Sequence, residues 1–499
     1  MKNSIAFFVA LFLSLAAQAQ APDLTLTGTI EGRDHQTYRN VPFDVPAGVH
    51  RITVQFEYDR ANDKTTIDLG LLGPDGFGGP NGFRGWSGGN KSEFSVADLD
   101  ATPSYLPGPI TPGRWSLILG VPNARPKAHT RFVARVYFSK DGAAPAMLDT
   151  PLRGGPAWYR GDLHMHTAHS DGSCTSQSGQ RRVPCPMFFS AATAAARRLD
   201  FIVVTDHNAV SQQQALRELQ PYFDELLLIP GIELTSFSGH ANYMGASLPV
   251  DFRIGSREVP NWNALLDKLP RQGFLSINHP VRPSGEICMG CGWTAAPPID
   301  MGRVDGMEVV NGVDADTPYT GLPLWQAELD RGHHITAVGG SDDHDASNAL
   351  DTPQYGHIGM PTTVVYAQAL SQSAILAALH EGHAFIDVAG ATSGQRRLLE
   401  FTARQDGREA MMGDTIRAPK DAVLNLRIRV AHVAGGVMQI LLDGKPMRLS
   451  GEGRISDEDH AVELDCPSDG ERHTLRVEVR DAAGKLALIG NPIYVDRPM

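Results

Sequence analysis

The sequence predicts an α/β protein in which a central α/β barrel lies between two small β-sandwiches. The chain has 499 residues, which is enough for about three domains of roughly 150 residues each. Residues 148–395 alternate short apolar runs with amphipathic stretches, as parallel strands joined by helices do. Residues 20–147 and 396–499 instead contain short alternating runs separated by Gly, Pro and Asp, which is typical of β-sandwiches.

The first residues have the pattern of a secretory signal peptide. Lys2 supplies a positive charge, residues 5–16 are apolar, and an A-x-A sequence ends at Ala19. We therefore expect residues 1–19 to be removed near the Ala19–Gln20 bond, and the mature protein to be periplasmic or secreted. The apolar stretch is too short to span a bilayer comfortably, and no later stretch predicts a transmembrane segment.

The N-terminal β domain, residues 20–147, contains five short runs that predict strands. They are Leu24 to Ile30, Arg51 to Tyr58, Thr65 to Leu71, Trp115 to Val121 and Phe132 to Phe138. A glycine-rich loop at 73–89 carries Phe77, Phe83 and Trp86. The favoured interpretation is a loop that packs its own aromatic side chains. The alternative is a platform for carbohydrate, since exposed aromatic rings stack on sugars.

The central domain, residues 148–395, shows strand and helix patterns in repeated succession. The predicted strands are Phe201 to Thr205, Leu226 to Ile229, Phe274 to Ile277, Gly306 to Val310 and Ile335 to Val338. The predicted helices are Met187 to Leu199, Ser211 to Leu219, Asn263 to Leu269 and Ala374 to Leu379. With about 240 residues of such units, a barrel is expected rather than an open sheet.

The C-terminal segment, residues 396–499, returns to strand patterns. Residues 423–430 and 474–479 alternate apolar and polar side chains, and the run 437–442 leads into Asp443-Gly444, a hairpin signal. These features predict a second small β-sandwich.

Charge and composition indicate which kinds of molecule the protein is expected to bind. Apolar residues make up 42% and charged residues 20% of the chain, as in ordinary globular proteins. The 44 Lys and Arg residues against 56 Asp and Glu residues give a net charge of −12, which repels a phosphate backbone and argues against a nucleic-acid groove. A small phosphoester at a metal centre remains compatible, because the metal charge dominates locally.

Because a periplasmic or secreted protein meets an oxidising compartment, we expect disulfides among the five cysteines. Two local disulfides are favoured, Cys174–Cys185 and Cys288–Cys291, each closing one loop. Cross-pairing between the two loops is a serious alternative, and a Cys-x-x-Cys zinc knuckle would require a second pair. Cys466 is expected to be a buried free thiol.

Histidines and carboxylates cluster where the apolar runs of the central domain end. In a parallel barrel these positions meet on one face, and imidazole and carboxylate are ligands that borderline divalent metals prefer. Nine such residues predict a multi-metal site: His164, His166, Asp171, His207, Glu233, His240, His279, Asp342 and His344.

Spacing within the motifs suggests how the ligands share faces. Side chains two apart in a strand face the same side, so His164 with His166, and Asp342 with His344, can each hold one metal. The same argument favours Asp342 over its neighbour Asp343.

Four further residues are expected to orient a ligand, bind the substrate or act as the general acid. Of the adjacent pair Asp206 and His207, only one can point inward; we choose His207, and Asp206 then becomes a candidate acceptor that orients a ligand imidazole. We expect Arg282 to bind a phosphate or carboxylate group. An equally weighted alternative is that Arg282 only forms a surface salt bridge. His357 and His169 are candidate general acids.

The ordered motifs resemble a known superfamily. His-x-His followed by Ser-Asp-Gly, Thr-Asp-His-Asn, Gly-Ile-Glu, Gly-His, Asn-His-Pro and Gly-Ser-Asp-x-His is similar to the PHP (polymerase and histidinol phosphatase) superfamily over residues 161–365. The Asn-Pro-Ile-Tyr-Val sequence at 491–495 favours its secreted or periplasmic CehA/McbA-type branch. The resemblance implies a distorted (βα)7 barrel, two or three divalent ions (Zn, Mn or Fe), the nine residues above as ligands, and Glu233 as a bridging ligand.

The resemblance and the ligand set lead to one favoured function and two alternatives. We expect a periplasmic or secreted phosphoesterase that hydrolyses a small phosphomonoester or phosphodiester with a hydroxide held between metals near Glu233. The first alternative is a metal-dependent carboxyl or carbamate ester hydrolase. The second is a non-catalytic protein that binds envelope polysaccharide or a partner.

Overall fold

The computed structural model divides the chain into two compact units, Met1–Ala143 and Ala144–Met499. It describes residues 21–59, 64–89, 91–140, 150–245, 249–285, 288, 290–347, 356–447 and 453–497. The expected signal peptide, residues 1–19, lies outside the described residues. Within the second unit, the predicted boundary between residues 395 and 396 stays a prediction.

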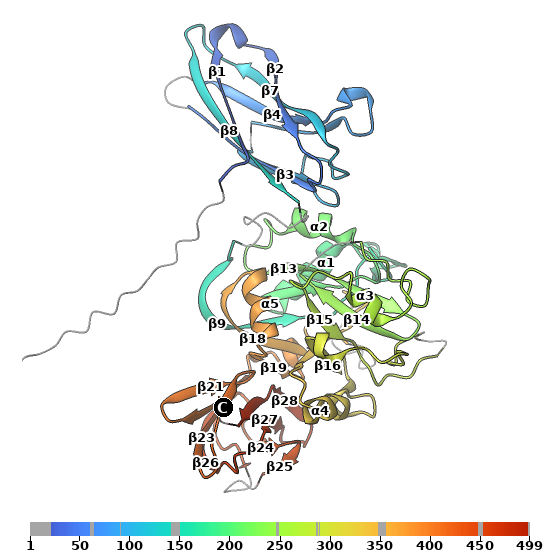
Figure 1. Cartoon of the computed structure of the whole chain (residues 1–499), viewed down its shortest axis with the longest axis vertical. Helices are drawn as coiled ribbons and strands as arrows, with labels where there is room; N and C mark the ends of the chain where they lie inside the picture. Colours follow the sequence, from blue (N-terminus) through green and yellow to red (C-terminus); the bar gives the residue numbers. More distant parts are fainter. Residues whose placement is uncertain are drawn as a thin grey trace, which may run out of the picture. The chain divides into compact units, whose positions relative to one another are not determined.

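The first unit contains two four-stranded antiparallel sheets among its described residues (Figure 1). One sheet has the order β1 (Leu24–Glu31), β8 (His129–Ser139), β3 (Arg51–Tyr58) and β6 (Glu93–Ala97). The other has the order β2 (Thr37–Val45), β7 (Gly113–Asn123), β4 (Thr66–Leu72) and β5 (Phe83–Gly88). Both sheets contribute to one core that includes Ile52, Trp115 and Phe132, which are almost fully buried. Two short 3-10 helices, Gly32–Asp34 and Gly76–Gly78, lie in the connections.

The glycine-rich loop of this unit packs some of its own aromatic rings. Phe77 and Phe83 stack with centroids 5.4 Å apart, and Trp86 makes an edge contact with Tyr38. Phe77 nevertheless remains 73% exposed. A carbohydrate partner at this loop stays a prediction.

The second unit begins as an α/β arrangement in which strands outnumber helices. Its strands are β9 (Arg153–Asp162), β12 (Phe201–Val204), β13 (Leu227–Ser236), β14 (Gly239–Met244), β15 (Phe274–Ile277), β16 (Gly306–Asn311), β17 (Thr336–Gly340), β18 (Thr362–Leu370) and β19 (Ala384–Asp387). Its helices are α1 (Met187–Ala196), α2 (Gln212–Leu219), α3 (Trp262–Leu266), α4 (Leu322–Asp330) and α5 (Gln372–His380). No helix among the described residues combines the length and apolar character needed to cross a bilayer.

This sheet contains both parallel and antiparallel strand pairs. Strands β9, β12 and β13 pair in parallel, β14 pairs antiparallel with β13 and β15, and β15, β16 and β17 again pair in parallel. Beyond the last residues of β17 and β9 the chain makes a parallel bridge between Met165 and Asp343. Asp342 N donates to His164 O at 2.8 Å in the same place. The two ends of the series therefore meet at the edge that carries the predicted ligands.

Apolar side chains inside this series hold the ligand-bearing ends in place. Phe201, Ile229 and Phe274 are fully buried in one cluster. A Cβ at Gly161 would come within 2.2 Å of the Phe201 ring, so the glycine that precedes the His-x-His motif allows β9 to approach β12. A closed (βα)7 barrel stays a prediction, since the observed fold is rich in strands and includes the antiparallel β14.

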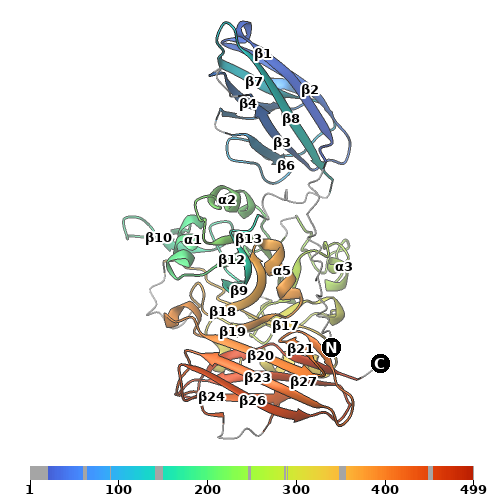
Figure 2. The ribbon, with the colours of Figure 1, turned by 90° about the vertical axis from the view of Figure 1, so that its left-hand side faces the viewer.

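One part of the C-terminal segment forms a sheet of its own, and another part extends the central sheet. Its strands are β20 (Leu398–Gln405), β21 (Arg408–Met411), β22 (Thr415–Arg417), β23 (Val423–Ala431), β24 (Val437–Leu442), β25 (Lys445–Pro446), β26 (Asp459–Pro467), β27 (His473–Arg480), β28 (Leu486–Gly490) and β29 (Ile493–Asp496). Strands β21, β20, β23 and β26 form one antiparallel sheet (Figure 2). Strands β28, β27, β24 and β25 continue the central sheet through β19 (Figure 1).

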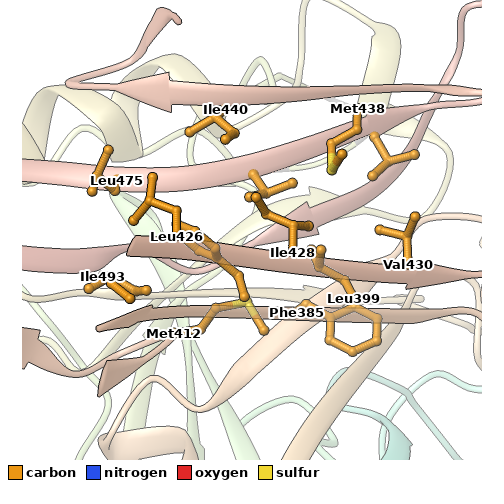
Figure 3. Packing of buried hydrophobic residues seen from close by; sticks show 14 of the residues in the cluster. Phe385, Leu399, Met412, Leu426, Ile428, Val430, Met438, Ile440, Leu475 and Ile493 are labelled. Atoms are coloured by element: carbon orange, nitrogen blue, oxygen red, sulfur yellow. The ribbon is translucent and has the colours of Figure 1, made fainter. Parts of the chain in front are cut away.

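One apolar core joins these two sheets (Figure 3). Leu426 and Ile428 of β23 are fully buried among Ile440 of β24, Leu475 of β27 and Phe385 of β19. Because Phe385 belongs to the central sheet, the C-terminal core is continuous with the scaffold of the ligand-bearing strands. The remaining short elements are the hairpin β10 (Ser173–Thr175) and β11 (Arg182–Pro184), and the 3-10 helices Met301–Arg303, Asp314–Asp316 and Gly390–Ser393.

Candidate metal centre

The structure brings all nine predicted ligands together at one edge of the central sheet. They fall into four overlapping groups whose ligand atoms lie within 4.8 Å of one another. The groups are His166, Asp171, His207 and His344; His164, His166 and Asp342; His164, Glu233 and His279; and His240, His279 and Cys291. Eight of the nine lie in or just after strands, and Asp171 reaches in from the loop after the His-x-His motif.

Glu233 of β13 lies at the centre of these groups and is fully buried. Ring nitrogens of five histidines lie within 3.6 Å of its two oxygens: His164, His166, His207, His240 and His279. Burial alone would raise the pKa of this carboxyl, but the nearby charges of His164 and His207 outweigh burial and hold the pKa well below its usual value. An ionised carboxylate shared among several imidazoles can bridge two cations.

Asp342, and not Asp343, faces the histidines. Its Oδ1 lies 3.2 Å from His164 Nε2 and 3.1 Å from His166 Nε2. The Asp343 carboxylate instead accepts a hydrogen bond from Asp345 N at 3.0 Å, and burial together with the Asp162 charge raises its pKa to about 7. Asp342 has a left-handed backbone with φ of 53°, a strained conformation for a non-glycine residue that is typical of functional positions.

The group of His166, Asp171, His207 and His344 contains the more exposed side chains of the centre, and we call it the outer group. Asp171 Oδ1 lies 3.4 Å from His344 Nε2 and 3.7 Å from His207 Nε2. Side chains of Asp171 and His344 are 58% and 39% exposed, whereas those of His164 and His166 are fully buried. The centre is therefore open to solvent on the side of Asp171 and His344.

Glu308 is a residue of the candidate centre that the sequence reasoning missed. Its Oε1 lies 3.0 Å from His164 Nδ1, and its Oε2 accepts from His279 N and Asn311 Nδ2, each at 2.9 Å. It therefore fixes the ring of His164 so that Nε2 faces Asp342 and Glu233. The sequence signal that could have identified Glu308 is an acidic residue inside an otherwise apolar predicted strand. Every residue of that strand, β16, is buried in the structure.

Asp206 is fully buried and has a different partner from the one expected. Its carboxylate accepts from Thr167 N and Thr167 Oγ1 at 2.8 Å each, and from Ser170 Oγ at 2.6 Å. These contacts hold the loop that carries Asp171. The observed imidazole-orienting contact comes from Glu308 of β16 instead.

Arg282 lies at the rim of the centre. Its Nε donates to Asp314 at 2.8 Å, and its Nη1 lies 3.6 Å from Asp342 Oδ2. The side chain is 30% exposed, and the ion pair with Asp314 is the salt bridge that the alternative expectation described. An anion-binding role for Arg282 stays a prediction.

The two candidate general acids have different surroundings. His357 is buried in the loop before β18, where its carbonyl accepts from Met360 N at 2.7 Å. The Nδ1 of His169 lies 2.8 Å from Ser211 Oγ, and His169 belongs to none of the ligand groups found among the described residues. An acid role for either stays a prediction.

The donor set fits divalent metal ions. Among the described residues, the buried His164 Nε2 and His166 Nδ1 have no hydrogen-bond partner. Burying such atoms unpaired costs free energy, which a cation between these nitrogens and the carboxylates of Glu233, Asp342 and Asp171 would offset. Mixed imidazole and carboxylate donors suit Zn, Mn or Fe.

The cysteines pair as favoured, within each loop. Cys174 bonds to Cys185, Cys288 bonds to Cys291, and Cys466 is a buried free thiol. The second disulfide lies beside the metal ligands, because Cys291 belongs to the group of His240 and His279.

No family model matches the sequence, and no curated protein matches it. Among solved structures, the chain is similar to a two-domain protein containing a predicted PHP-like metal-dependent phosphoesterase from Bacteroides vulgatus. That similarity has 17% sequence identity and a TM-score of 0.38, and it covers 69% of this chain and 98% of the other.

Proposed function

We propose that this protein is a metal-dependent hydrolase, and that its substrate is a small phosphomonoester or phosphodiester. The observation that carries the proposal is the set of adjoining ligand groups around the buried carboxylate of Glu233. Such a set offers places for two or three divalent ions, with Glu233 shared between them.

The residues divide into three holding positions. His164, His166 and Asp342 form the inner position, and Glu233 with His240 and His279 forms a second. Asp171, His207 and His344 form the outer position. Bound divalent ions would lower the pKa of water towards neutrality and would stabilise negative charge on phosphoryl oxygens.

Other side chains would orient the substrate and the ligands. Arg282, held by Asp314 beside Asp342, presents a guanidinium that suits a phosphoryl or carboxylate oxygen. Glu308 keeps His164 in one ring orientation, which is the usual task of a carboxylate behind a ligand imidazole.

We further propose that the central fold is a distorted (βα)7 barrel of the PHP superfamily, of the CehA/McbA type, and that the protein is periplasmic or secreted. The ordered motifs and the meeting of β9 with the end of β17 support the first part. The two loop disulfides are compatible with an oxidising compartment. N-terminal mass analysis of protein from the cell envelope, showing Gln20 as the first residue, would test the second part.

The function is tested with the purified mature chain loaded separately with Zn, Mn or Fe. The panel contains aryl phosphomonoesters and phosphodiesters, nucleotides, glycerophosphodiesters, aryl carboxyl esters and aryl carbamates. We expect turnover of at least one phosphoester class, lost in His166→Ala and kept in His333→Ala. His333 is the matched control, because its imidazole bonds Glu328 on α4.

Two results would contradict the proposal. Hydrolysis of carboxyl esters or carbamates without hydrolysis of any phosphoester would reassign the bond that is cleaved. Absence of bound metal after loading, measured by elemental analysis, would remove the hydrolase assignment itself.

A further inference from the structure

We propose that Cys291, once released from its disulfide with Cys288, becomes a ligand of the metal ion held by His240 and His279. The centre would then have two forms, an oxidised form without the thiolate and a reduced form with it. This inference rests on the metal centre proposed above and is independent of which ester bond is hydrolysed.

The geometry already places the sulfur among the ligand atoms. Cys291 Sγ and a ring nitrogen from each of His240 and His279 lie within 4.8 Å of one another, and Cys291 is 1% exposed. A divalent ion bonded at about 2.0 Å to imidazole and about 2.3 Å to thiolate brings such atoms to roughly 3.5 Å in a tetrahedral site. The proposal therefore requires the three side chains to rotate so that these atoms come closer together.

Hydrogen bonds hold the backbone around Cys291 against both histidines. Its carbonyl oxygen lies 3.3 Å from His279 Nδ1, which leaves His279 Nε2 directed at Glu233. Just after Cys291, Trp293 N donates to Pro280 O and Thr294 N donates to Ser238 O, each at 2.9 Å. The position of Cys291 is therefore set by the turn after His279 and by the hairpin that carries His240, and does not require the disulfide.

The two sulfurs differ in accessibility in a way that favours this release. Cys288 is partly exposed, whereas Cys291 is buried. The thiolate of a dithiol reductant attacks Cys288 Sγ, the S–S bond breaks, and the electron pair leaves on Cys291 Sγ. The second thiol of the reductant then displaces Cys288 as a thiol, and the reductant becomes a disulfide. The sulfur freed beside the metal is thus already a thiolate, the form that binds metal.

The consequence is a change from an open to a closed metal position. Glu233, His240 and His279 would supply three ligands to a bound ion, which would leave room for water or substrate, as catalytic sites require. Adding Cys291 completes a set of four, as in structural sites. Reduction should therefore lower turnover by occupying the open position.

The test uses Co²⁺ as a spectroscopic probe in the full mature chain. The protein is reduced with a phosphine, desalted without oxygen and then loaded with Co²⁺, so that no added thiol contributes. Imidazole and carboxylate ligands give weak visible d–d bands, whereas a thiolate adds an intense near-ultraviolet charge-transfer band. We expect d–d bands in both redox forms and the charge-transfer band in the reduced form alone.

Two variants keep the test decisive if reduction perturbs the fold. Cys288→Ser should show the charge-transfer band without reductant, and Cys291→Ser should lack it in both forms. Cys466→Ser, which removes the free thiol of the C-terminal core, should behave as the unmodified chain. Visible d–d bands without a charge-transfer band in reduced protein and in Cys288→Ser would overturn the proposal and leave the metal centre intact. Absence of d–d bands in every form would overturn the metal centre and the proposal together.

Discussion

The inner part of the candidate metal centre and the C-terminal core are both buried, but they are built from opposite kinds of side chain. Around Glu233 the buried groups are imidazoles and carboxylates, and some of their atoms, such as His164 Nε2, have no hydrogen-bond partner among the described residues. Around Leu426 and Ile428 the buried groups are aliphatic and aromatic, contributed by two sheets (Figure 3). The two regions are connected through β19, whose Phe385 packs in the C-terminal core.

This difference separates stability from function within one unit. Apolar burial stabilises a fold by roughly 25 cal/mol per Å², whereas buried charges cost free energy unless they are paired or hold a metal. The metal centre therefore depends on a scaffold that is stabilised elsewhere. Changes at the centre should alter chemistry with little unfolding, and changes in the core should do the reverse.

The largest expected effect is that of Glu233→Gln. The variant loses the carboxylate that five imidazoles surround. Metal chemistry supplies several kcal/mol of transition-state stabilisation, so kcat/KM should fall by about 10³-fold or more. Steady-state kinetics and elemental analysis measure the loss, while circular dichroism should show an intact fold. Unfolding of this variant would contradict the idea that the centre contributes to chemistry and the core to stability.

Leu426→Ala tests the other side of the comparison. It removes a fully buried side chain from the core in Figure 3 and should reduce the free energy of unfolding by about 2–5 kcal/mol. Denaturant titration measures this loss. Metal content and kcat per folded molecule should stay unchanged, and a matching loss of kcat would show that the core controls the centre.

Glu308→Gln tests whether the missed carboxylate positions a ligand or merely fills space. Without its charge-assisted contact to His164 Nδ1, metal affinity should fall about 10- to 100-fold. Competition with a chelator measures the affinity, and kcat at saturating metal should change little. Glu328→Gln on α4, a buried glutamate that bonds Arg331 and His333, is the matched control. Equal metal affinity in both variants would reduce Glu308 to a structural role.

The smallest expected effect lies at the junction between the two regions. His383 Nε2, just before β19, lies 3.0 Å from Asp414 Oδ1 in the β21–β22 turn, and this hydrogen bond raises the pKa of His383. The contact should therefore stabilise the fold fully below about pH 6.5 and progressively less as pH rises through the raised pKa. The pKa of Asp414 is lowered, since its burial is outweighed by the His383 bond, so the contribution is also lost in acid.

His383→Gln should therefore destabilise the chain by less than about 1 kcal/mol, since the pair is partly exposed. Thermal unfolding between pH 5 and pH 9 would measure it. A difference from the unmodified chain that grows with pH would contradict the assigned ion pair.

Local sequence patterns predicted some elements accurately, because turn-forming residues mark where those elements end. Strand β24 spans the predicted 437–442, since the apolar run ends at the Asp443-Gly444 turn. Strand β18 was not predicted, although its first residues are β-branched or aromatic. Its pairing with β9, about 200 residues earlier, leaves no local signal. The sharing of a sheet between the central and C-terminal segments escaped prediction for the same reason.

The sequence by itself determined which kinds of side chain lie at the ends of the central strands, because strand periodicity and apolar runs are local properties. The nine candidate ligands followed from those positions together with the resemblance of the ordered motifs. Tertiary structure alone decided that Glu308 supports His164 from 144 residues away, that Asp206 holds a loop, and that Cys291 lies beside His240 and His279. Those contacts join strands distant in the chain, and only the closing of the sheet brings their side chains within bonding distance.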